Sequence, residues 1–70
     1  MAHEIKLRED YIKLGQALKA VGLVDSGVEA KEVILSGLVK VNGNIEYQRG
    51  KKLHEGDLVE YKNESIKIIN

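Results

Sequence analysis

The feature that most constrains the fold of this chain is a change of hydrophobic period at Gly37. The apolar residues before it recur at the spacing of one helical face, namely Ala30, Val33 and Ile34. After it, Val39 and Val41 alternate with Lys40, as expected for a strand with one buried side. A helix must therefore end, and a strand must begin, within a few residues of this glycine.

Ser26 and Glu29 predict where that helix begins. In a capping box, the serine hydroxyl and the glutamate carboxylate each accept a hydrogen bond from a backbone amide that has no partner within the helix. An earlier helix is expected to follow Glu9 and Asp10, because acidic groups are favourable at a helix start. Its apolar stripe consists of Leu14, Ala17, Leu18 and Val21. Gly22 is expected to end it as a left-handed C-cap.

Alternating apolar residues and turn residues divide the rest of the chain. Strands are expected at residues 5–8, 39–41, 45–47, 58–61 and 66–68. Turns are expected at 42–44, 55–57 and 62–64, and a polar, basic loop at 48–52. The pattern predicts one α+β domain over residues 1–70, with two packed helices followed by a small antiparallel sheet. The first strand is expected to pair with the last.

Charge is unevenly distributed along a chain whose formal net charge is zero. Residues 38–52 carry Lys40, Arg49, Lys51 and Lys52 against Glu46, whereas residues 53–70 are acidic overall. This asymmetry permits a positive patch on a neutral protein. There is no cysteine, so disulfides and thiolate zinc sites are excluded. No apolar run approaches the length of a signal peptide or a membrane span, so we expect a cytoplasmic protein without membrane contact.

No residue pattern indicates catalysis. His3 and His54 are too far apart in the sequence to indicate a local metal site, and the seven glycines are spread singly rather than clustered around a phosphate. No acid pair or nucleophile–base set stands out. We therefore expect neither enzymatic activity nor a cofactor nor a metal.

The ordered set of signals resembles the S4 RNA-binding domain family. The matching residues are Ala30, Val33-Ile34, Gly37, Val39-Lys40-Val41-Asn42-Gly43 and Gly56-Asp57, with Leu14, Leu18, Gly22 and Ser26 also fitting. The resemblance covers residues 11–61 and is similar to that of small single-domain bacterial members. It implies binding of structured RNA, either ribosomal or transfer RNA, by a monomer that associates with the ribosome or another ribonucleoprotein. Many members carry arginine directly after the helix-starting serine, where this chain has Gly27.

The residues expected to contact RNA phosphates on one face are Lys31, Lys40, Arg49, Lys51 and Lys52. Lys19 is a weaker candidate, because a cation near a helix end also stabilises the helix dipole. Among the three tyrosines, Tyr47 lies nearest the basic loop and is the one to test for base stacking. The alternative is a protein-interaction module of the same fold with little RNA affinity, which the neutral charge and the glycine at position 27 favour.

Overall fold

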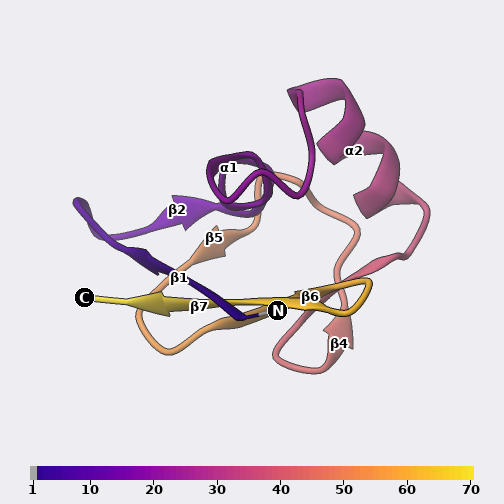
Figure 1. Ribbon diagram of the computed structural model, residues 1–70. Coiled ribbons are helices and arrows are strands. Elements are labelled where there is room, and N and C mark those ends of the chain that lie inside the picture. Colours follow the sequence, from indigo (N-terminus) through magenta and orange to yellow (C-terminus); the bar gives the residue numbers. More distant parts are fainter. Residues whose placement is uncertain (1) are drawn as a thin grey trace.

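A computed structural model describes residues 2–70. Its larger sheet has five strands in the order β1-β7-β6-β3-β4. These are β1 (Ala2–Lys6), β3 (Val39–Val41), β4 (Asn44–Ile45), β6 (Leu58–Tyr61) and β7 (Glu64–Ile69). Both helices, α1 (Leu14–Ala20) and α2 (Gly27–Leu35), lie on the same side of this sheet (Figure 1). The expected α+β architecture, with two helices packed on a small sheet, is confirmed.

The expected pairing of the first and last strands is also confirmed, and it is parallel. In β1 and β7, Ala2 lies opposite Ser65 and Lys6 opposite Ile69. The other pairs in this sheet, β7 with β6, β6 with β3 and β3 with β4, are antiparallel. The sheet is therefore mixed. Its parallel pair, β1 with β7, follows from the crossover of the chain through both helices after β1.

The core fills the space between the helices and the covered face of the sheet. Fully buried side chains from the helices are Leu14, Ala17, Leu18, Ala30 and Ile34. They meet buried side chains from the strands, among them Val39, Val59, Ile66 and Ile68. Burying this apolar surface is what holds two short helices in place, since neither would be stable alone.

The turns and caps follow the predicted positions. The Glu29 amide donates to the Ser26 hydroxyl at 3.1 Å, as expected of an N-cap. The Glu29 carboxylate accepts from the Asp25 amide at 2.7 Å, one residue earlier than the capping-box pattern implies. Gly22 has φ +79°, which confirms the left-handed end of α1. Asn42 and Gly43 both have positive φ, at 52° and 85°, as a tight hairpin turn requires.

Two expectations are wrong at a second, smaller sheet. It consists of β2 (Ile12–Lys13) and β5 (Lys52–Leu53), in antiparallel register. As a consequence α1 begins at Leu14 rather than directly after Glu9 and Asp10, and no acidic residue lies in its first turn. Lys52, expected in a loop, lies in a strand. Each of these strands is too short to produce an alternating pattern, and their pairing joins segments about forty residues apart, so no local signal reveals it.

No helix within residues 2–70 is long and apolar enough to cross a membrane.

Candidate nucleic-acid interface

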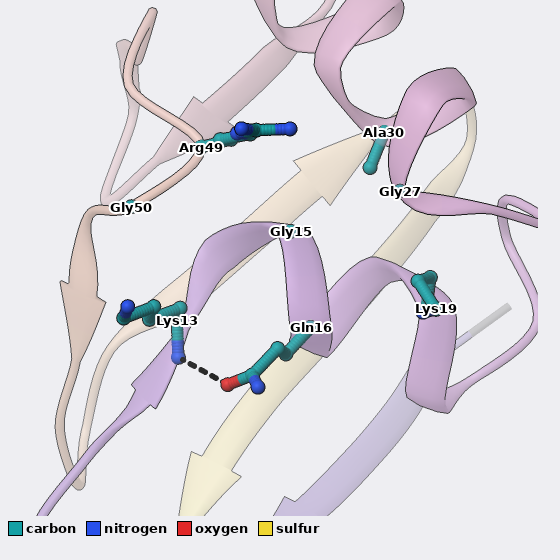
Figure 2. A pocket seen from close by; sticks show the side chains of 8 residues that line it. All are labelled: Lys13, Gly15, Gln16, Lys19, Gly27, Ala30, Arg49 and Gly50. Atoms are coloured by element: carbon teal, nitrogen blue, oxygen red, sulfur yellow. Dashed lines mark hydrogen bonds between the residues drawn. The ribbon is translucent and has the colours of Figure 1, made fainter.

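Three cations from three separate segments line a hollow of about 330 Å³ beside α1. Lys13 comes from β2, Lys19 from the last turn of α1, and Arg49 from the connection between β4 and β5. In Figure 2 the Arg49 side chain extends toward Gly27 and Ala30 at the start of α2. The hollow therefore gathers cations that are up to 36 positions apart in the sequence.

The other lining residues are uncharged. They are Gly15, Gln16, Gly27, Ala30 and Gly50. A Cβ atom added at Gly27 or Gly50 would meet no atom within 4 Å beyond the adjoining chain, so both glycines border open space. No carboxylate lines the hollow. Its electrostatic potential is therefore positive although the whole chain is neutral, and an anion is the ligand that it favours.

Backbone hydrogen bonds fix Arg49 at this place. The first amides of α1, those of Leu14 and Gly15, donate to the carbonyls of Lys51 and Arg49 at 2.9 and 3.0 Å. The Lys51 amide in turn donates to the Gln48 carbonyl at 3.1 Å and closes a turn. The basic segment 48–51 is thus held against the start of α1, and its carbonyls satisfy helix amides that would otherwise lack partners.

None of the three lining cations has an ion-pair partner among the residues that the structure describes. Within residues 2–70 the one salt-bridge contact joins the His3 ring to Glu64 at 2.9 Å, on the far strands β1 and β7, and it is an ion pair only when His3 is protonated. Positive groups without a carboxylate beside them are free to pair with phosphates. Because no carboxylate of the described residues neutralises these cations, the hollow can bind an anion.

Of the five residues predicted to contact phosphates, Arg49 alone lines the hollow. Lys31 lies one helical turn after Gly27, on the same side of α2, and therefore flanks the hollow. Lys52 lies directly opposite Lys13 in the β2–β5 pair. Lys51 is exposed, and its charge contributes to lowering the pKa of Asp57.

Lys40 lies on a different face of the molecule. Its neighbours Val39 and Val41 are buried beneath the helices, so the Lys40 side chain points to the uncovered face of the sheet. There it lies opposite Glu60 on one side and Ile45 on the other. The structure does not bring Lys40 together with the other predicted contacts.

Sequence reasoning missed Lys13 and undervalued Lys19. A signal for Lys19 exists, because Gly15, Gln16 and Lys19 share the helical face opposite the buried stripe of α1. No local signal marks Lys13, whose position depends on the two-residue pairing with β5. Tyr47 is exposed and lies against Gly37, on the part of the molecule next to β4 rather than beside the hollow.

Comparison with known proteins now decides the family. A family model for the S4 domain matches residues 5–69. The chain belongs to the S4-domain family. The resemblance expected from residues 11–61 is therefore confirmed, and the match extends into both terminal strands.

Two relatives of this S4-domain chain are bacterial proteins of similar size. The chain is 37% identical, over an alignment of 71 residues that covers 100% of both chains, to the Bacillus subtilis (strain 168) protein named "Probable ribosome maturation protein RlbA". It is 31% identical over 62 residues, 89% of each chain, to the Escherichia coli (strain K12) protein named "Putative RNA-binding protein YbcJ".

Proposed function

We propose that this S4-domain protein binds structured RNA and catalyses no reaction, with an RNA phosphate seated in the hollow between α1, α2 and residues 49–50. The observation that carries the proposal is that Lys13, Lys19 and Arg49 all line one hollow, which no carboxylate lines. Phosphate contacts supply most of the sequence-independent affinity of a protein for nucleic acid. A neutral chain can bind RNA in this way because affinity depends on the local arrangement of charge.

The chemistry of the lining favours a phosphate over other anions. Arg49 can donate two parallel hydrogen bonds to a phosphate, and the lysines add point charges from either side. Gly27 and Gly50 leave room for a backbone to approach closely. Lys31, Lys51 and Lys52, which lie around the hollow or next to its lining residues, extend the proposed interface, whereas Lys40 is omitted from it because it lies on the uncovered sheet face.

The absence of catalytic groups from the lining of the hollow and the names of the relatives also support a binding role. Its lining contains no histidine, carboxylate or hydroxyl group that could act as a base or a nucleophile. One relative is named for RNA binding and another for ribosome maturation. We therefore propose ribosomal or transfer RNA as the ligand, and the ribosome or another ribonucleoprotein as the setting, for a monomer acting in the cytoplasm.

A salt titration with transfer RNA as the probe tests this proposal. The double variant Lys19→Ala with Arg49→Ala should bind more weakly than the parent. Its log–log dependence of affinity on salt should flatten by roughly 0.7–0.9 for each phosphate interaction that the substitutions remove. The measurement is a series of fluorescence anisotropy titrations at increasing salt concentration.

The matched control removes two cations from the uncovered face of the sheet. Lys40→Ala with Lys67→Ala lowers the net charge by the same amount, but both residues lie far from the hollow. This variant should keep the affinity and salt dependence of the parent to within about a factor of two. Equal losses in the two double variants would show that only overall charge matters, and the hollow would be rejected as the phosphate site.

A protein-interaction role is the second candidate, and one observation favours it. Large apolar side chains are exposed around β4 and the end of α2, at Leu35, Leu38, Ile45 and Tyr47. Exposed apolar groups that lie close together can mark protein-binding surfaces. The same titration separates the two roles, because a protein-interaction module would show no RNA binding that weakens with salt.

A further inference from the structure

A second hollow, of about 480 Å³, lies against α1 next to the proposed phosphate site. It is formed by the end of β1, the connection to β2, and the outer side of α1. Apolar residues such as Leu7 and Ile12 line it together with Tyr11. Lys6 and Arg8 supply positive charge, against the single carboxylate of Glu9. This lining suits a flat, largely apolar group attached to an anionic chain.

The two hollows adjoin each other at Gln16. Its side chain lines both, and its amide oxygen accepts from the Lys13 backbone amide at 3.4 Å (Figure 2). Ligand groups that occupy the two hollows would therefore lie next to each other at Gln16. The Gln16 amide can also donate and accept hydrogen bonds, as the polar edge of a nucleobase requires.

The aromatic ring of Tyr11, a residue that lines the second hollow, lies among basic groups. Tyr11 is 37% exposed, and the Lys52 ammonium lies 4.8 Å from its ring centre. The His54 ring is tilted by 53° to it, with 6.3 Å between ring centres. Lys13 and Lys52 lie directly opposite each other, an arrangement of like charges that destabilises a strand pair. These two like charges and the exposed aromatic ring together favour an anionic, stacking ligand.

We propose that the second hollow binds an unpaired nucleobase, stacked on Tyr11, from the same RNA chain whose phosphate occupies the first hollow. The inference rests on the proposed RNA-binding function and makes it more specific. The volume lies within the range of small-molecule sites. The preferred ligand is then a paired RNA that carries a bulged nucleotide, since a fully paired helix cannot extend a base into the hollow.

The test compares two RNA hairpins that differ by one bulged adenosine. The parent protein should bind the bulged hairpin more tightly than the fully paired hairpin. Tyr11→Leu should weaken binding to the bulged hairpin by about fivefold or more, and should leave binding to the paired hairpin nearly unchanged. Tyr11→Phe keeps the aromatic ring and should bind both hairpins as the parent does. Tyr47→Leu, the same change at an exposed tyrosine beside β4, is the matched control and should alter neither affinity.

A second measurement needs no variant. With 2-aminopurine at the bulge, transfer of the base from the RNA stack onto Tyr11 should change its fluorescence when the parent protein binds. Unchanged fluorescence would overturn the proposed base site, and so would an equal effect of Tyr11→Leu on both hairpins.

Arg49→Ala separates this inference from the function on which it rests. If Arg49→Ala weakens binding to both hairpins while Tyr11→Leu has no effect, the phosphate site stands and the base site is rejected. If neither change affects either hairpin, RNA binding through these two hollows is rejected altogether.

Discussion

At the scale of single residues, Asn42 and Asp57 stabilise the two turns that carry the family resemblance. The Asn42 side chain donates to one Asp57 oxygen at 3.0 Å and accepts from the Leu58 amide at 2.9 Å. The other Asp57 oxygen accepts from the His54 amide at 2.7 Å. These bonds tie the β3–β4 turn to the turn before β6. Both residues therefore hold the sheet together and lie outside the candidate RNA interface.

Asp57→Asn should make stability less dependent on pH. Partial burial acts to raise the pKa of Asp57, but hydrogen bonds from His54 and Asn42 outweigh it and hold the pKa below its ordinary value. A lowered pKa in the folded state adds stability above the ordinary carboxyl pKa, and this contribution is lost as the pH falls through the folded value. Urea denaturation should show the variant less stable at neutral pH by about 1 kcal/mol, with the difference vanishing in acid.

Glu55→Gln is the control for this prediction, because Glu55 is exposed and makes no hydrogen bond within residues 2–70. It should leave the pH dependence of the unfolding free energy unchanged. If Asp57→Asn proved as stable as the parent at neutral pH, the hydrogen bonds of this carboxylate would contribute nothing to stability.

Gly27→Arg should strengthen RNA binding. Many S4 domains have arginine at this position, and here the glycine lines the hollow with open space beside it. The new guanidinium would join Arg49, so the salt dependence should steepen by roughly 0.7–0.9 for one added phosphate interaction. Val28→Arg adds the same charge on a neighbouring exposed residue that does not line the hollow. Anisotropy titrations that found an equal increase in affinity for both variants would contradict a specific role for position 27.

At the scale of elements, the short β2–β5 ribbon matters most. It fixes the start of α1, holds residues 49–51 beside that helix, and faces Lys13 toward Lys52. Its inner pair, Ile12 and Leu53, packs against the core, and Leu53 is fully buried. A ribbon of two residues in each strand could not persist alone. Its position therefore depends on the core beneath it, and the interface depends on the ribbon.

Lys13→Glu should raise stability while lowering RNA affinity. The change replaces a pair of like charges with a pair of opposite charges across β2 and β5, which should add about 0.2–1 kcal/mol to the unfolding free energy. It also removes a cation from the hollow. Thermal denaturation and anisotropy titration of one preparation would measure both effects.

Lys40→Glu is the reciprocal control. It places a carboxylate opposite Glu60, so it should lower stability and leave RNA affinity almost unchanged. If Lys13→Glu lowered stability or kept its full RNA affinity, the opposed lysines would have no functional explanation.

At the scale of the whole molecule, one small core supports everything else. The chain has 70 residues, and a core of this size rarely supplies more than about 3–5 kcal/mol of net stability. Leu14 is fully buried in that core, and its amide donates to the segment that carries Arg49. The integrity of the core and the geometry of the hollow are therefore directly linked.

Leu14→Ala should leave the protein largely unfolded. Truncation of a fully buried leucine costs about 2–5 kcal/mol, which is comparable with the whole stability expected here. Far-ultraviolet circular dichroism would show the loss of helix. Leu38→Ala is the control, because Leu38 is 55% exposed and its truncation should cost little. A Leu14→Ala protein that unfolded at the same urea concentration as the parent would show that the core tolerates this truncation.

The sequence by itself determined the elements whose signals are local. The hydroxyl of Ser26, the positive φ of Gly22 and the Asn42-Gly43 turn depend on neighbouring residues, so composition and spacing were enough to place them. The change of period at Gly37 was equally clear, and with the turns it indicated both the fold class and the family.

Only the tertiary structure decided which cations lie together. Lys13, Lys19 and Arg49 line one hollow because a two-residue strand pair and two backbone hydrogen bonds join segments that are distant in the sequence. Lys40 belongs to residues 38–52, the segment with the net positive charge, yet it lies on the other face, because alternate residues of a strand point in opposite directions. Charge along a chain is a one-dimensional quantity, whereas binding depends on where the folded backbone places each charge.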